Sequence, residues 1–124
     1  MIEVIERLAD STVEMAILSD VNTKEGKNML SWFGILDAFD AITTSEEVGR
    51  TKPDSAMFEA ALSKIEAGPA ETLMIGDRYK HDMEGAAKVG VSTIAFGAEE
   101  GPEVNFSIEH PREILDIVGM DGYN

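Results

Sequence analysis

The segment that decides the fold is Thr72–Asp82, which reads TLMIGDRYKHD. Its first residues, Thr72–Ile75, are mostly apolar and predict a short strand of a buried parallel sheet. Asp77 follows that strand and one glycine, at a position where a carboxylate has no structural use. Asp82 could simply cap the helix predicted over residues 82–89. Two carboxylates in one turn also suit Mg²⁺, a hard cation that takes oxygen ligands and keeps several waters.

Outward from this segment, predicted strands alternate with predicted helices. The strands are expected at 13–18, 39–43, 72–75, 91–96 and 105–108, and the helices at 2–9, 24–33, 53–65, 82–89 and 111–118. This alternation predicts an α/β, Rossmann-like parallel sheet with helices on both faces, which binds ligands at the carboxyl ends of its strands. We expect the 13–18 strand to be covered on both faces, and Met29, Leu30 and Phe33 to face the core. One domain is expected over 1–118, followed by a tail at 119–124.

Other polar residues also follow predicted strands. Ser19 ends the first strand, and its hydroxyl could donate to a phosphate oxygen. Lys52 lies in the loop after the second strand, and its ammonium is a compact charge suited to an anion. Taken alone, Ser19 could merely end a strand and Lys52 could be a solvated loop lysine. The information lies in the order: a hydroxyl, then a lysine, then Gly-Asp with a second Asp five positions on.

That order resembles the haloacid dehalogenase (HAD)-like hydrolase superfamily. Ala16–Ser19 (AILS) matches the family's second motif, an apolar strand that ends in Ser or Thr. Thr51–Asp54 (TKPD) matches its third motif, and Met74–Asp77 (MIGD) with Asp82 matches its fourth. The resemblance covers residues 2–118.

The resemblance implies a phosphatase that acts on small phosphorylated molecules with Mg²⁺ as cofactor, through an aspartyl-phosphate. On this reading Lys52 and Asp77 are catalytic, Ser19 and Lys52 bind phosphate, and Asp77 and Asp82 bind the metal. A receiver domain carries similar groups in the reverse order, and the Gly-x-Gly-x-x-Gly of a dinucleotide-binding fold is absent.

One family motif has no counterpart in the sequence. The family's first motif is Asp-x-Asp, which carries the nucleophile and the acid/base, and no Asp-x-Asp occurs in these 124 residues. The chain therefore resembles the C-terminal part of the core, without the central nucleophile strand or a substrate-selecting cap. In an alternative alignment, Asp20 is the nucleophile of a degraded first motif with Asn22, and Thr43 or Thr44 is the hydroxyl of the second. Asp20 also stands where the family usually has Asn after the second-motif hydroxyl.

Three functions stay open at this point. The chain could be a fragment or split subunit of a phosphatase, a catalytically dead binding module, or a weakly active hydrolase that uses Asp20. We expect negligible activity of the isolated chain. We also expect either direct pairing of the strands that flank the missing one, or a strand from another chain between them. We favour the second outcome, in which the chain associates either with a copy of itself or with an N-terminal half of the core.

Composition removes several other classes of function. The chain has 24 acidic and 10 basic residues, a formal net charge of −14, so nucleic acid and anionic membranes are poor partners. It has no cysteine, which excludes disulfides, thiolate metal sites and thiol nucleophiles. A cytoplasmic location is the default expectation.

Overall fold

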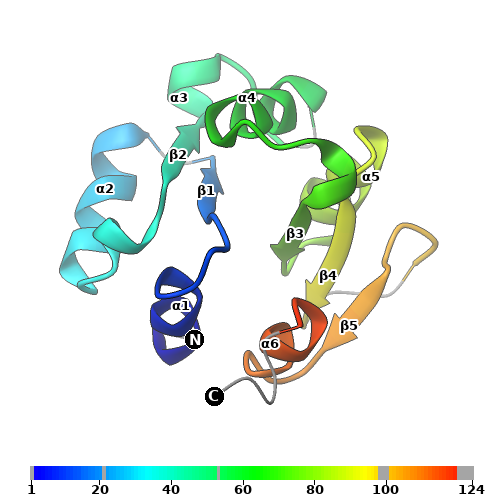
Figure 1. The fold of residues 1–124 in the computed structure, drawn as a ribbon. Helices are drawn as coiled ribbons and strands as arrows, with labels where there is room; N and C mark the ends of the chain where they lie inside the picture. The colour runs from blue at the N-terminus through cyan, green and yellow to red at the C-terminus, as the bar shows by residue number, and fades with distance from the viewer. Residues whose placement is uncertain (1, 21, 53, 98–100, 120–124) are drawn as a thin grey trace.

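The computed structural model describes residues 2–20, 22–52, 54–97 and 101–119. Parallel strands are flanked by helices, as the sequence predicts for an α/β protein (Figure 1). In this described part of the chain, no helix has both the length and the apolar character needed to cross a membrane. The tail expected at 119–124 falls outside the described residues except for Gly119.

The strands form two sheets, whereas one was expected. In the first sheet β1 (Ala16–Ser19) pairs parallel with β2 (Ala41–Thr44). In the second sheet β4 (Ser92–Phe96) lies between β3 (Leu73–Gly76) and β5 (Phe106–Ile108), and all pairs are parallel. Among the described residues, β1 and β3 are not hydrogen-bonded to each other. Direct closure of the two sheets, one of the outcomes considered above, is therefore not observed.

The helices follow the sequence pattern with shifted boundaries. They are α1 (Ile2–Ala9), α2 (Thr23–Trp32), α3 (Ser45–Val48), α4 (Ser55–Ile65), α5 (Gly85–Lys88) and α6 (Glu113–Ile117). Short 3-10 turns occur at Leu36–Ala38 and Pro69–Glu71, and a π-helical turn, η3, at Tyr79–Glu84. The sequence pattern did not predict α3, and the single helix expected at 82–89 is divided into η3 and α5.

Two hydrophobic cores lie on opposite faces of the strands, because successive side chains of a strand point to opposite sides. Leu73 and Ile75 belong to the first core and Met74 to the second. The buried residues of the first core are Val4, Leu8, Ile94, Ile108, Ile114 and Leu115. Those of the second are Met57, Phe58, Ala86 and Val91.

The two sheets share both cores, although no backbone hydrogen bond between described residues joins them. Val13 and Met15, just before β1, pack in the first core, and Leu18 of β1 packs in the second. Helix α4 contacts β1, β2 and α5, so it spans from one sheet to the other, and α1 packs against α6 below (Figure 1). Side-chain packing therefore holds β1 and β3 as two halves of one body.

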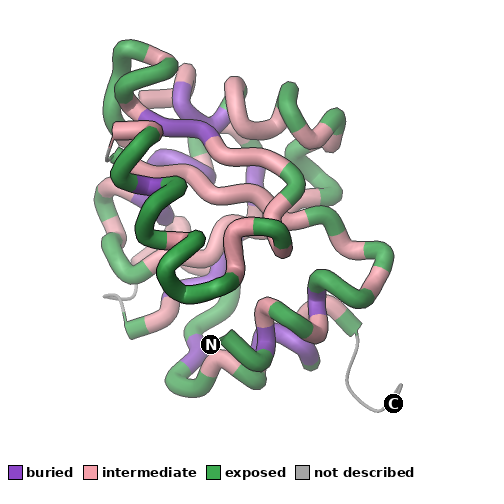
Figure 2. Tube along the Cα trace, turned by 90° about the vertical axis from the view of Figure 1, so that its left-hand side faces the viewer, coloured by how far each residue is buried: buried purple, intermediate pink, exposed green. Residues whose placement is uncertain are grey.

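Burial of the strands differs between the two halves. Thr93, Ile94 and Ala95 of β4 are fully buried, while every residue of β1 and β3 is half-buried (Figure 2). The expectation of a strand at 13–18 covered on both faces was wrong: the strand begins at Ala16 and is only half-covered. A strand that is hydrogen-bonded along one edge alone lacks a second neighbouring strand, which would otherwise shield its other edge from water.

Helix α2 presents a different face from the one expected. Met29 and Phe33 are 53% and 54% exposed, and Trp32 is 86% exposed, so the prediction that Met29 and Phe33 face the core was wrong. The buried residue of α2 is Gly26, and the helix contacts β2 and the 3-10 turn at Leu36–Ala38. Gly34, just after the end of this helix, adopts the left-handed conformation (φ 72°) that glycine tolerates.

Candidate active site

The side chain of Lys52 connects the two halves of the molecule. Its Nζ donates to Asp82 Oδ1 at 2.8 Å and to the carbonyl oxygen of Leu18 at 3.5 Å. Leu18 lies at the carboxyl end of β1, and Asp82 lies in the turn that follows β3. The Lys52 and Asp82 side chains are 13% and 4% exposed, so this ion pair is largely shielded from water. The carboxyl ends of β1 and β3 therefore meet at Lys52, as the order of the motifs predicted.

The loop that carries Lys52 is held at both ends by local backbone features. Before it, Gly49 ends α3 in the left-handed conformation (φ 79°). After it, Asp54 caps α4 by accepting a hydrogen bond from Ala56 N at 2.9 Å. Within the loop, Lys52 N donates to Asp20 Oδ1 at 3.1 Å. These contacts fix the main chain of Lys52 as well as its ammonium group.

The glycine that precedes Asp77 is required for a steric reason. A Cβ atom on Gly76 would collide with the carboxylate and Cβ of Asp82, so only glycine fits there. Asp82 Oδ2 accepts from Arg78 N at 3.1 Å, and Asp82 N donates to Arg78 O at 2.8 Å. The second aspartate thus folds back over the end of β3 and holds the π-helical turn, a type of distortion often found at functional sites.

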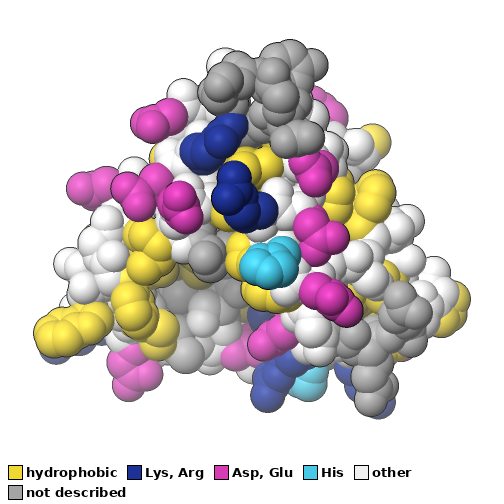
Figure 3. All heavy atoms as spheres, turned by 90° about the horizontal axis from the view of Figure 1, so that it is seen from below, with side chains coloured by type: hydrophobic (Ala, Val, Ile, Leu, Met, Phe, Trp, Pro, Cys, Tyr) yellow, Lys and Arg dark blue, Asp and Glu magenta, His cyan; other side chains and the backbone are white. Residues whose placement is uncertain are grey.

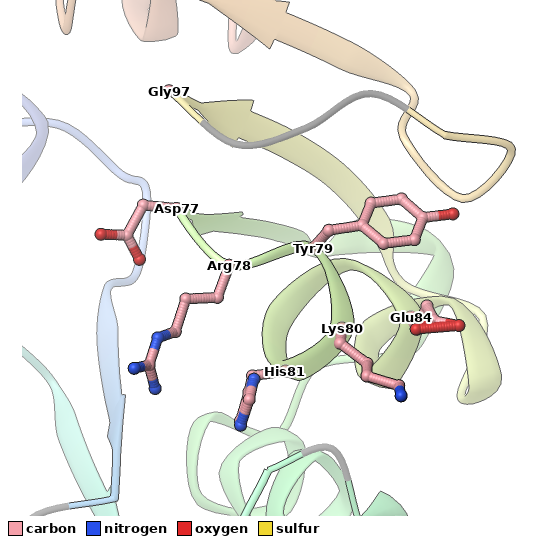
Figure 4. Close-up of a pocket in the computed structure, with 7 residues that line it drawn as sticks. All are labelled: Asp77, Arg78, Tyr79, Lys80, His81, Glu84 and Gly97. Atoms are coloured by element: carbon pink, nitrogen blue, oxygen red, sulfur yellow. The ribbon is translucent and has the colours of Figure 1, made fainter.

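Asp77 lies at the mouth of a cavity of about 480 Å³ beside this turn. It is exposed, and its carboxylate makes no hydrogen bond or ion pair with any other described residue. Arg78, Lys80, His81 and Glu84 also line the cavity. Figure 4 shows the carboxylate of Asp77 and the guanidinium of Arg78 on the same side of the chain, away from Tyr79.

The donors for a metal ion are incomplete in the described part of the chain. Asp77 offers an open carboxylate, whereas Asp82 has one oxygen on Lys52 and the other on Arg78 N. The described residues contain no group of three or more His, Cys, Asp or Glu side chains that could hold a metal. Mg²⁺ commonly binds through one or two carboxylates with waters, so Asp77 suits part of such a site.

The other predicted residues surround Lys52 at different depths. Ser19 is half-buried at the end of β1, one residue after the carbonyl that Lys52 contacts. Asp20 has its carboxylate on Lys52 N, and its carbonyl oxygen accepts from Ser45 Oγ at 2.6 Å. It lines a second cavity with Asn22 and Arg50.

Thr43 and Thr44, the hydroxyls of the alternative alignment, are fully buried. Thr44 Oγ1 is 2.8 Å from Thr23 Oγ1, and Thr43 Oγ1 has no hydrogen-bond partner among the described residues. Neither threonine lines the cavity at Asp77 or the one at Asp20. The contact of Asp20 with Lys52 gives Asp20 a structural use that the sequence pattern did not indicate.

Comparisons with known proteins agree with this arrangement. A family profile described as haloacid dehalogenase-like hydrolase matches residues 1–96, and the chain therefore belongs to this family. It is 33% identical over 107 residues to a ribulose-1,5-bisphosphate 5-phosphatase of Halopiger xanaduensis, which covers 86% of this chain and 45% of that protein. It is 29% identical over 112 residues to a glyceraldehyde 3-phosphate phosphatase of Methanopyrus kandleri. This match covers 83% of this chain and 48% of that protein.

A solved structure extends the comparison to the fold. The HAD phosphatase of Thermococcus onnurineus superposes with a TM-score of 0.88 at 26% identity, covering 95% of this chain and 56% of that one. The chain spans about half the length of the curated relatives it matches. Its Rossmann-like fold and its relation to phosphatases follow from these similarities.

We predict that Lys52→Met lowers the free energy of unfolding by about 3 kcal/mol, because it leaves the buried Asp82 carboxylate without its counter-charge. Urea denaturation followed by far-UV circular dichroism measures this loss. Lys64→Met is the matched control. Lys64 pairs with Glu47, and their side chains are 33% and 43% exposed, so we expect a loss of about 1 kcal/mol or less. Equal losses in both variants would contradict a special role for the Lys52–Asp82 pair.

Proposed function

We propose that this chain is the C-terminal part of a Mg²⁺-dependent phosphomonoester hydrolase of the HAD type, acting on a small phosphorylated molecule in the cytoplasm. The observation that carries the proposal is the ion pair of Lys52 with Asp82 where the carboxyl ends of β1 and β3 converge, with the open carboxylate of Asp77 directly after β3. The two relatives named above, a ribulose-1,5-bisphosphate 5-phosphatase and a glyceraldehyde 3-phosphate phosphatase, support this reaction class.

The proposal gives each side chain a chemical task. The hydroxyl of Ser19 and the ammonium of Lys52 hold the phosphate oxygens. Lys52 would share its charge between Asp82 and the phosphate, because it already contacts Asp82 at 2.8 Å. A cation held this way is oriented in advance and needs little rearrangement when negative charge develops on the phosphate.

Asp77 and Asp82 form the proposed metal site with different tasks. Asp77 supplies the open carboxylate, and Asp82 orients the turn and reaches the ion through water. The bound Mg²⁺ would neutralise phosphate charge during the reaction. The full coordination shell needs further oxygen ligands, which in the proposal come from the segment that carries the nucleophile.

We predict that the 124-residue chain binds Mg²⁺ weakly, at millimolar concentration, through Asp77. Titration with Mg²⁺, followed by amide NMR shifts, should move the signals around residues 76–82. The Asp77→Asn variant should lose these shifts because it removes the open carboxylate, whereas Asp37→Asn, an exposed carboxylate in a 3-10 turn elsewhere, should retain them. Identical titrations of the wild type and Asp77→Asn would exclude this site.

The nucleophile belongs to a strand that lies between β1 and β3 in the proposal. The facing edges of these strands have no strand partner among the described residues. Neighbouring strands lie about 4.8 Å apart, so one inserted strand needs about twice that distance between its neighbours. The inserted strand would satisfy two rows of backbone groups at once. We propose that it comes from another chain, either a second copy or an N-terminal half.

We predict that open edges of β1 and β3 make the purified chain associate. Analytical ultracentrifugation should show a mass that rises above that of the monomer with concentration. Hydrogen exchange should find the amides of β4 protected, and the amides of β1 and β3 that point to the gap between the sheets protected only in the associated form, because backbone groups with strand partners exchange slowly. A strictly monomeric chain in which these gap-facing amides are protected would mean that the two sheets pair directly in solution.

A second candidate function rests on the sequence itself. These 124 residues contain no Asp-x-Asp, so a binding module without chemistry would have the same fold and the same anion-binding groups. A third candidate uses Asp20, although its carboxylate accepts a hydrogen bond from Lys52 N at 3.1 Å.

We predict negligible hydrolysis of p-nitrophenyl phosphate by the chain on its own, because no paired nucleophile and acid/base are present. Wild type, Asp20→Asn and Asp77→Asn should be alike in this assay. Robust turnover that disappears in Asp20→Asn would identify Asp20 as the nucleophile. Co-expression with an upstream segment that carries Asp-x-Asp should restore activity if the phosphatase proposal holds, and should leave it absent for a binding module.

A further inference from the structure

We propose that Arg78 and His81 bind a second phosphate group of the substrate, so that the substrate class is a small bisphosphate. The inference deepens the proposed function and rests on it, because it takes the reacting phosphate to lie at Lys52 and Asp77. The evidence is the cavity beside Asp77, the directions of the side chains that line it, and their charges.

The cavity has the size of a metabolite site. Its volume of about 480 Å³ lies within the range of small-molecule sites, about 300–1,000 Å³. Asp77, Arg78 and His81 all line it, so a ligand held at Asp77 extends toward the guanidinium of Arg78 and the imidazole of His81. A sugar bearing two phosphates fits this volume, whereas a macromolecule would have to lie outside it.

The side chains of the turn that follows β3 point in two directions. Figure 4 shows Arg78 and His81 pointing to one side of the turn, with Tyr79 and Lys80 on the other. The Tyr79 hydroxyl donates to Glu103, which holds this side chain away from Asp77. Arg78 and His81 are therefore the groups that meet a ligand next to Asp77, although Lys80 lines the same cavity.

The position of Arg78 is fixed relative to Lys52. Both backbone polar groups of Arg78 are bonded to Asp82, at 3.1 Å through its N–H and at 2.8 Å through its carbonyl. Asp82 in turn holds the ammonium of Lys52 at 2.8 Å. One buried carboxylate thus fixes the backbone from which the Arg78 side chain extends relative to the ammonium of Lys52, and a site held in this way favours ligands whose two charges lie a matching distance apart.

The net charge of the molecule makes the guanidinium of Arg78, free of ion pairs to the described residues, unusual. The chain carries a net charge of −14, and Figure 3 shows acidic side chains spread over a face with few basic ones. Such a surface repels anions unless cations are gathered locally. The guanidinium of Arg78 has no ion pair with any described residue, so its charge is available to a ligand.

The donor geometry favours phosphate. Arginine binds phosphate oxygens through two parallel N–H groups, and a neighbouring imidazole can donate to a third oxygen. An exposed arginine such as Arg78 and a half-buried histidine such as His81 are ordinarily just solvated. Here Arg78 and His81 line one cavity with the open carboxylate of Asp77, so one ligand could contact all three side chains.

The test is a binding experiment on the 124-residue chain, with ribose 5-phosphate and ribose 1,5-bisphosphate as probes and NMR shifts as the readout. The bisphosphate should bind about tenfold more tightly than the monophosphate, because its second phosphate adds charge-assisted hydrogen bonds. Arg78→Gln and His81→Gln should each remove most of this advantage and leave the affinity for ribose 5-phosphate within about twofold of wild type.

Lys80→Gln is the matched control, because it removes the same charge from the same turn on the side away from Asp77. It should retain the bisphosphate advantage. Equal affinity for the two probes, or an equal loss in Lys80→Gln and Arg78→Gln, would overturn the inference. If ribose 5-phosphate causes no shift around Lys52 and Asp77, the proposed function fails separately, and the bisphosphate titrations of the Arg78 and Lys80 variants still decide the second site.

Discussion

The ion pair between Lys52 and Asp82 is the interaction on which the rest of the structure depends. The two sheets share no backbone hydrogen bond among the described residues, and this pair joins their carboxyl ends. A largely buried ion pair is costly to form from hydrated ions, so it contributes more to geometry than to stability. Its geometric effect is to keep a cation, an open carboxylate and the turn at 79–84 in one small region.

The same constraint explains why several small features of the sequence occur together. Asp82 can fold back over β3 only because Gly76 has no side chain. Its two oxygens then hold Lys52 and the backbone of Arg78, and Asp20 holds the backbone of Lys52. Each residue is ordinary alone, but the group forms a network in which one change leaves a buried polar atom unpaired.

The sequence was sufficient to predict the order of most elements and the α/β class, because apolar periodicity is a local signal. It placed Ser19, Lys52 and Asp77 after strands, but it assigned Asp82 to the metal and did not predict the ion pair of Asp82 with Lys52. It did not predict the exposure of Met29 and Phe33, because the residue that α2 buries is Gly26, which an apolar pattern does not mark. It also missed the π-helical turn, because that turn follows from two hydrogen bonds of Asp82. The division into two sheets is a tertiary property that residue patterns do not record.

The exposed face of α2 has a consequence for spectroscopy. Trp32 is the single tryptophan of the chain and is 86% exposed. Its indole is already in water in the folded state, so its emission should lie close to that of a free indole and change little on unfolding. Intrinsic fluorescence is therefore a poor measure of folding here. The same indole becomes a sensitive reporter of any molecule that covers α2, since burial would shift its emission to shorter wavelength.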